Sequence, residues 1–179
     1  MHITTLVPPA SEPVALAACK AFLKVDYDGQ DELITSLISA ARAQVEIASQ
    51  TALIDRTVRI AYDKWPEAAF CTGRLTLPVK PAKALNLIEI DGLDYTEQFV
   101  LSNYERSVLT FSGSDLPFAD HSVIVEVIVG SGADENAIPP DLRLAVLFAV
   151  ADAYQNGEQG GALSARVKAL TAPWREVRI

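Results

Sequence analysis

The sequence of 179 residues has few of the residue types that small enzymes and metalloproteins use. It contains two cysteines, two histidines and one methionine. Cys19 and Cys71 cannot form a disulfide framework, and no CxxC pair is present. Two cysteines and two histidines cannot make up a metal quartet on spacing alone. The composition therefore predicts no metal and no other cofactor.

Positive charge and long apolar runs are also scarce. The chain has 15 Lys and Arg against 23 Asp and Glu, for a formal charge of −8. This balance disfavours wrapping nucleic acid or binding an anionic membrane surface. The longest apolar run, Leu144 to Ala151, is far short of the roughly 20 residues of a membrane span. Nothing near Met1 resembles a signal peptide, so we expect a soluble cytoplasmic protein of one domain.

Apolar residues at helical spacing predict four helices, at 13–25, 30–51, 139–156 and 164–171. The clearest stripe runs from Leu33 to Ala48, whereas Ser164 is expected to cap the last helix. The helix at 139–156 is apolar nearly all round, which predicts burial on several sides, in a central position or in a subunit contact. The residues assigned to this packing are Leu142, Val146, Phe148 and Tyr154.

An alternating pattern predicts a block of five to six antiparallel strands over 55–130. Asp91-Gly92 is a strong hairpin signal. The best strand, Ser122 to Val129, has valines on one face and only one charge on the other, so both faces should be partly covered. Because the strands are grouped between helices, we predict an α+β fold: a helical bundle of two N-terminal helices, a long C-terminal helix and a short last helix, with the antiparallel block between them.

Four places could carry chemistry, and three of them are better explained as structure. His121 lies beside Asp120 and Ser122, but neighbours in a strand point to opposite faces and cannot form a nucleophile relay. The run from Asp26 to Glu32 is interpreted as a turn, because Asp31 and Leu37 stand where a calcium loop needs its sixth-position glycine and its twelfth-position glutamate. Cys19 is expected in the core. Cys71 is placed in a loop, where its reactivity is a weak hypothesis.

The C-terminus combines residue types that are enriched at binding hot spots. Pro173 ends the last helix, and the segment after it has no periodic partner. The segment 173–179 is therefore predicted either to dock on a partner or to pack on its own domain. The residues assigned to docking are Trp174, Arg175, Val177, Arg178 and Ile179.

Four stretches, in order along the chain, are similar to the head–tail connector (adaptor) proteins of tailed bacteriophages and gene transfer agents. They are residues 12–26, 31–42, 138–158 and 170–175, and the third begins with Ile138-Pro139-Pro140. Each motif is a packing and turn signature, and their order and spacing make the resemblance specific. Ala15 stands where the family has Thr, so Ser11 is expected to cap the first helix instead. Ser131-Gly132 replaces the family's Tyr-Gly pair.

The resemblance implies a single connector domain over 1–172 with a docking tail at 173–179. It implies a non-enzymatic virion protein, made in the bacterial cytoplasm and located at the head–tail junction. There it would form a ring, typically a dodecamer, under the portal protein. DNA would pass through the ring only as cargo, stopper or tail terminator proteins would dock below, and no membrane is involved. The alternatives are another ring-forming neck or tail component, such as a tail terminator or head-completion protein, and a small hydrolase using Cys71 or His121.

Overall fold

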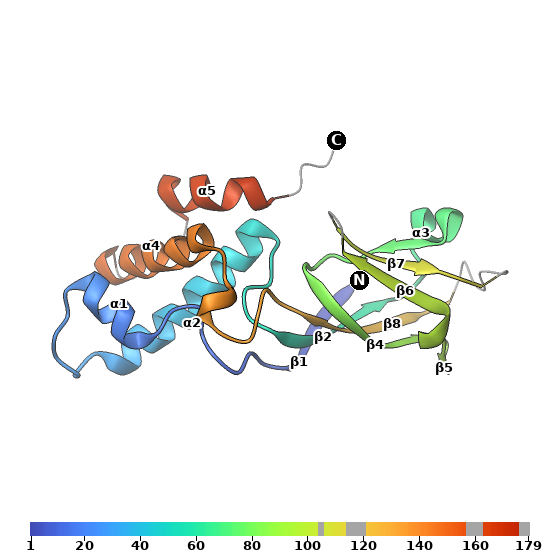
Figure 1. The fold of residues 1–179 in the computed structure, drawn as a ribbon, viewed down its shortest axis with the longest axis horizontal. Coiled ribbons are helices and arrows are strands. Elements are labelled where there is room, and N and C mark those ends of the chain that lie inside the picture. The colour runs from blue at the N-terminus through green and yellow to red at the C-terminus, as the bar shows by residue number, and fades with distance from the viewer. Residues whose placement is uncertain (104–105, 114–120, 157–162, 176–179) are drawn as a thin grey trace. The chain divides into compact units, whose positions relative to one another are not determined.

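The computed structural model describes residues 1–103, 106–113, 121–156 and 163–175, and it confirms the predicted α+β fold (Figure 1). The chain divides into two compact units. The sheet unit consists of residues 1–9 and 55–130, and the helical unit consists of 10–54 and 131–179. The sheet unit is thus largely an insertion between two halves of the helical unit.

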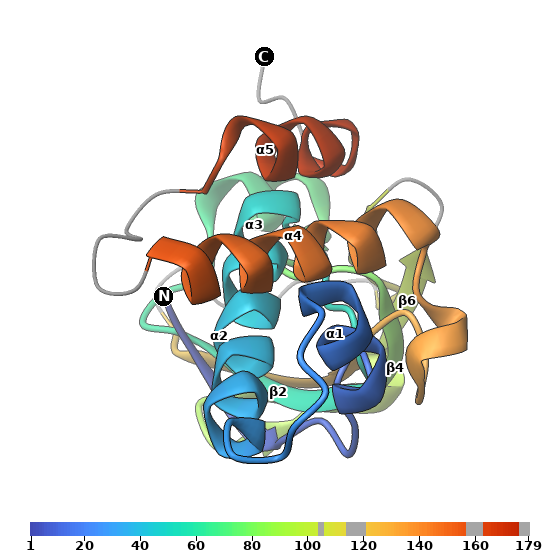
Figure 2. The same cartoon turned by 90° about the vertical axis from the view of Figure 1, so that its left-hand side faces the viewer.

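The helical unit is built around α4 (Pro140–Asn156), which packs against α1 (Leu16–Leu23), α2 (Asp31–Ser49) and α5 (Ala165–Thr171). Figure 2 shows α4 running across α2, with α5 lying along α4. Two 3-10 helices, η2 (Glu135–Ala137) and η4 (Ala172–Trp174), flank α4 and α5. The fully buried core side chains of this unit come from α1, α2, α4, α5 and the segment after α2; they include Cys19, Ile34, Val45, Leu53, Leu142, Val146 and Val167. Helices of its own unit therefore cover most of the apolar surface of α4, although Leu144 is 37% exposed.

The first helix is shorter than predicted and is capped differently. It begins at Leu16, so Pro13 lies before the helix and not in its first turn. Ser11 does not cap it, because its hydroxyl donates to the carbonyl of Ala133 at 2.8 Å. The backbone N–H of Ala15 instead donates to the Glu135 carboxylate at 3.1 Å. A carboxylate 120 positions away thus accepts the N–H of the N-cap residue, the donor that the glutamate of a local capping box would satisfy.

Two other helix predictions need smaller corrections. Leu33, at the start of the predicted stripe of α2, is 51% exposed, and the buried face begins at Ile34. Ser164 occupies the N-cap position of α5 as expected, but its side chain makes no capping hydrogen bond.

The sheet unit holds more strands than predicted. A five-stranded antiparallel sheet has the order β1-β2-β8-β4-β5, and a three-stranded sheet has the order β3-β7-β6. Their bounds are β1 His2–Val7, β2 Arg56–Tyr62, β3 Arg74–Thr76, β4 Ala82–Ile90, β5 Leu93–Asp94, β6 Phe99–Asn103, β7 Ser107–Phe111 and β8 Val123–Val129. The N-terminal residues form the edge strand β1, which was not predicted. A short helix α3 (Glu67–Thr72) and a 3-10 helix η1 (Thr96–Gln98) were not predicted.

The central strand β8 behaves as its alternation predicts. Val123, Val125, Val127 and Val129 are fully buried, and the opposite face is partly buried. On that opposite face Glu126 pairs with Arg59 of β2, with Arg59 Nε 2.9 Å from the carboxylate. The predicted hairpin at Asp91-Gly92 is confirmed, since both residues have positive φ (48° and 82°) between β4 and β5.

The glycines that end β8 are required by close approach. Gly130 has φ of 145°, and a Cβ atom there would lie 2.5 Å from the backbone of Asp55. A Cβ on Gly132 would lie 2.0 Å from the Cβ of Ala137. No other residue fits either place without displacing its neighbour. The Gly-Ser-Gly segment is thus a packing constraint at the end of the inserted sheet unit.

Candidate functional site

The histidine examined for catalysis belongs to a structural cluster at the β4–β5 turn. His121 Nδ1 pairs with a carboxylate oxygen of Asp91. The other oxygen of Asp91 accepts from the backbone N–H of Ser122 at 3.1 Å and from its hydroxyl at 3.2 Å. A nucleophile relay needs the histidine between the hydroxyl and the carboxylate, whereas here the carboxylate lies between the other two. Asp91 therefore ties the hairpin turn to the start of β8; Asp120 lies outside the described residues.

The two cysteines have contrasting surroundings. Cys19 is fully buried in the core of the helical unit, and burial raises the pKa of its thiol. Cys71 is exposed, and it lies in α3 and not in the loop that was predicted. Within the described ranges, no group of three or more His, Cys, Asp or Glu residues could hold a metal ion. No helix in the described part of the chain is long and apolar enough to cross a membrane.

The acidic turn between α1 and α2 is held by one lysine. Lys20 Nζ lies 2.7 Å from a carboxylate oxygen of Asp28 and 2.7 Å from one of Asp31. The Lys20 ammonium lowers the pKa of the Asp28 carboxyl, and the hydrogen bonds to Asp28 and Asp31 raise the pKa of Lys20. Tyr27, between the acidic residues, is 52% exposed. The turn therefore combines an internal ion pair at Lys20 with an exposed aromatic ring at Tyr27.

The four residues assigned to packing on α4 lie within the helical unit. Leu142 and Val146 are fully buried. Phe148 is partly buried, its ring lies 5.8 Å from that of Phe22 on α1, and the Arg166 guanidinium lies 4.5 Å above it. The Tyr154 hydroxyl hydrogen-bonds to the side chain of Gln30 at the start of α2. These contacts join α4 to the helices around it.

The residues assigned to the docking tail have different surroundings. Trp174 lies in η4 and packs against the core of the helical unit, and its indole N–H donates to Asp141 Oδ2 at 2.6 Å. Arg175 is exposed. Val177, Arg178 and Ile179 lie outside the described residues, so their docking role stays a prediction. Trp174 thus anchors the beginning of the segment to its own unit.

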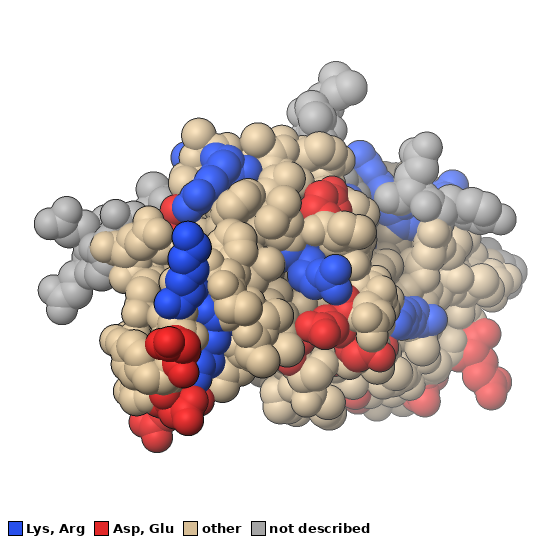
Figure 3. Space-filling model, turned by 60° about the vertical axis from the view of Figure 1, so that its left-hand side comes forward, with Lys and Arg blue, Asp and Glu red and all other residues tan. Residues whose placement is uncertain are grey.

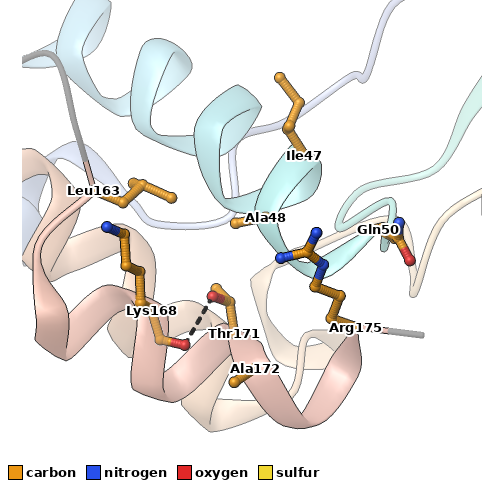
Figure 4. Close-up of a pocket in the computed structure, with 8 residues that line it drawn as sticks. All are labelled: Ile47, Ala48, Gln50, Leu163, Lys168, Thr171, Ala172 and Arg175. Carbon is orange, nitrogen blue, oxygen red and sulfur yellow. Dashed lines mark hydrogen bonds between the residues drawn. The ribbon is translucent and has the colours of Figure 1, made fainter. Parts of the chain in front are cut away.

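A groove lies between the C-terminal end of α2 and the α5–η4 segment, with a volume of about 410 Å³ (Figure 4). Its walls are partly apolar and carry two cations; the lining residues are Ile47, Ala48, Gln50, Leu163, Lys168, Thr171, Ala172 and Arg175. Figure 4 shows the Lys168 and Arg175 side chains extending from the α5–η4 side toward α2. Ile47 is 79% exposed, the largest exposed fraction among the large apolar residues that the structure describes. An apolar wall with two cations suits an occupant that is both apolar and acidic.

Sequence reasoning missed both this groove and a buried carboxylate close to it in sequence. Glu46 is 8% exposed, accepts the backbone N–H of Leu53 at 2.9 Å and lies 3.5 Å from Arg42. The spacing of Arg42 and Glu46, four residues apart on one helix, was a usable signal for the ion pair. Ile47 also gave a signal, because it is an apolar residue off the buried stripe of α2.

Comparisons with known proteins give matches in three-dimensional structure. No protein-family model and no curated protein sequence matches this chain. A chain from the virion of a native gene transfer agent (GTA) particle has a TM-score of 0.85 at 24% identity, over 100% of this chain and 97% of that one. The shared fold is that of a chain in a gene transfer agent particle.

Two further structures share this fold along the whole chain. A chain from the neck of an empty GTA particle, computed with C6 symmetry, has a TM-score of 0.85 at 24% identity. A chain from the neck of a native GTA particle, computed with C12 symmetry, has a TM-score of 0.78 at 25% identity. Each match covers 100% of this chain and 97% of the other. The similarity therefore includes both the helical unit and the inserted sheet unit.

Proposed function

We propose that this chain is a structural protein of the neck of a virus-like particle, either a gene transfer agent or a tailed bacteriophage. The observation that carries the proposal is the match in fold over 100% of this chain to chains from GTA necks. A shared fold alone does not assign a function. The connector motifs at 12–26, 31–42, 138–158 and 170–175 add an independent reason, because they are features of the sequence and do not depend on the fold.

Within the neck, we propose the role of head–tail connector, or adaptor. The chain would form a ring beneath the portal protein, let DNA pass through its centre and offer a lower surface to stopper or tail terminator proteins. The C6 and C12 symmetry of the similar neck structures supports a ring of many copies. A net charge of −8 is compatible with a channel through which DNA slides, because like charges prevent the DNA from binding to the wall.

We also propose that the chain is not an enzyme. Asp91 lies between His121 and Ser122 and so supports a turn and not a nucleophile. An exposed cysteine such as Cys71 needs a basic environment to become a good nucleophile. A particle that assembles and transfers DNA normally with Cys71→Ser and His121→Ala would support the structural role. Loss of a measured hydrolase activity in those variants would favour the hydrolase.

Gene deletion in the organism that makes the particle tests the connector role directly. Without this chain, particles should have filled or partly filled heads and no attached tails, while separate tails reach their normal length. Supplying the wild-type gene in trans should restore tailed particles. Tails of abnormal length would point to a tail terminator instead, and normal tailed particles would contradict any essential role in the neck.

The tail beyond Trp174 is proposed to dock on the portal or on a neighbouring copy. A chain ending at Arg175 keeps the Trp174 to Asp141 hydrogen bond and removes only residues 176–179. It should fold with an unchanged thermal transition and bind the portal protein much more weakly in a pull-down. Full portal binding by this shortened chain would contradict docking and favour the alternative that the tail packs within its own unit.

A further inference from the structure

The helical unit carries two exposed surfaces of opposite character at the two ends of α2. The groove described above lies at the C-terminal end of α2 and is lined by Lys168 and Arg175 together with apolar side chains. The acidic turn, residues 26–28, lies just before the N-terminal end of α2. Figure 2 shows the α1–α2 turn at one end of α2 and α5 at the other.

The groove has the chemistry of a site for an acidic and apolar segment. Among the described residues, neither Lys168 nor Arg175 has a carboxylate within ion-pair distance, and both are exposed. A volume of about 410 Å³ falls within the range of roughly 300–1,000 Å³ that is typical of protein pockets. The groove is thus large enough to admit an aromatic side chain.

The acidic turn has the complementary chemistry. Tyr27 is 52% exposed and is flanked by two exposed carboxylates, Asp26 and Asp28. Lys20 already pairs with Asp28, whereas Asp26 takes part in no ion pair within the described part of the chain. Tyrosine is among the residues enriched at the centres of interfaces, and its ring can also receive a lysine or arginine on its face. Figure 3 shows acidic side chains gathered at one end of a line of basic ones on this side of the molecule.

The placement of the two surfaces decides what kind of assembly they could make. A helix of 19 residues is about 28 Å long, so the two surfaces are separated by about that distance. A contact between two different patches of the same protein is heterologous, and repeated contacts of this kind close into a ring when the rotation allows. Two complementary patches at opposite ends of one helix would make a contact of this heterologous kind.

We propose that the acidic turn of one copy inserts Tyr27 into the α2–α5 groove of the next copy, with Asp26 facing Lys168 and Arg175. This inference rests on the proposed ring and names the surfaces through which neighbouring copies meet. Burial of the Tyr27 ring supplies contact area, and the opposite charges select the partner and the orientation.

Charge reversal in the particle-producing host tests the pairing. Asp26→Lys alone and the double change Lys168→Glu with Arg175→Glu should each lower the number of copies per purified neck by about tenfold. Combining all three changes should restore most of the incorporation, because the charges are again opposite. Asp26 is chosen over Asp28 so that the Lys20 clamp stays intact. The matched controls are Asp63→Lys and Arg74→Glu, two exposed charges of the sheet unit, which should incorporate normally.

Cross-linking gives a second readout that does not depend on copy number. In a Cys71→Ser background, Tyr27→Cys with Ala172→Cys should yield a ladder of oligomers when assembled necks are treated with a short bismaleimide. Either new cysteine alone should yield no ladder, because a heterologous contact does not bring identical residues together. A dimer from Tyr27→Cys alone would overturn the proposal in favour of a two-fold contact.

The outcomes separate the two proposals. If wild-type chain is absent from purified necks, both the neck function and this interface are wrong. If the chain is present and the reversals behave like the controls, or the triple change fails to restore incorporation, only the interface is wrong. Loss on reversal of the groove cations without loss for Asp26→Lys would mean that a different neck protein fills the groove, and this outcome also overturns the proposal.

Discussion

Substitution of Gly130 by alanine should strongly destabilise the sheet unit. At φ of 145° an alanine backbone is strained by roughly 1–3 kcal/mol. The added Cβ would also lie 2.5 Å from the N and Cα of Asp55, and such overpacking typically costs about 1–3 kcal/mol. The backbone has little freedom to move away, since the Gly130 N–H donates to the carbonyl of Pro81 at 3.0 Å. We therefore expect a loss of about 3–5 kcal/mol in the free energy of unfolding.

Gly92→Ala is the matched control for this substitution. Gly92 also has positive φ, 82°, but a Cβ atom there would meet nothing within 4 Å. Its substitution should cost only the backbone strain, roughly 1–2 kcal/mol. The difference between the two variants therefore measures the close approach to Asp55 separately from the strain.

Urea unfolding followed by tryptophan fluorescence can resolve the effect by unit. Each unit contains one tryptophan, Trp65 in the sheet unit and Trp174 in the helical unit. In a Trp174→Phe background, the signal of the buried Trp65 reports on the sheet unit. If Gly130→Ala lowers the unfolding midpoint no more than Gly92→Ala, the close approach to Asp55 does not constrain this position.

Three further changes test other contacts. Glu46→Ala leaves the Leu53 N–H without its acceptor and should cost about 2 kcal/mol in urea unfolding, whereas Glu46→Gln, which keeps an acceptor oxygen, should cost less. Trp174→Phe loses one hydrogen bond and should lower the stability of the helical unit by about 1 kcal/mol; a chain ending at Arg175 should match the wild type. Burial raises the pKa of Tyr62 to about 12, so the stability that the neutral Tyr62 contributes is complete below pH 10 and is lost as the pH rises toward 12. Tyr62→Phe should therefore lose less stability at alkaline pH than the wild type does, and identical pH profiles of the free energy of unfolding would refute this.

The predictable parts of the fold are those with a strong local pattern. The helix at Asp31–Ser49 and the strand at Val123–Val129 are long enough for periodicity to identify them. The Asp91-Gly92 turn was predictable because few residue pairs adopt two successive positive φ values. In contrast, β1 (His2–Val7) is exposed on both faces, and α3 (Glu67–Thr72) has fewer than two turns. An exposed strand and a helix this short give no periodic pattern of apolar residues in the sequence.

The sequence was less informative about the candidate site. The composition of the C-terminal segment drew attention to Trp174 and Arg175, but not to their different roles. Trp174 donates to Asp141, 33 positions away, while Arg175 lines a groove with Ile47. A local sequence pattern does not indicate which distant residue a side chain will contact. The composition of this segment was therefore equally consistent with docking on a partner and with packing on its own domain.

The sequence by itself determined the types and order of the main elements, because backbone geometry makes helix and strand repeat every 3.6 and two residues. It also supplied the connector motifs, whose residues are turn and packing signatures. Only the tertiary structure decided that Glu135 would cap α1, that Glu46 would accept the Leu53 N–H and that α2 and α5 would enclose a cationic groove. Such contacts depend on how several elements pack together. Their partners are far apart in the sequence, and no local repeat relates them.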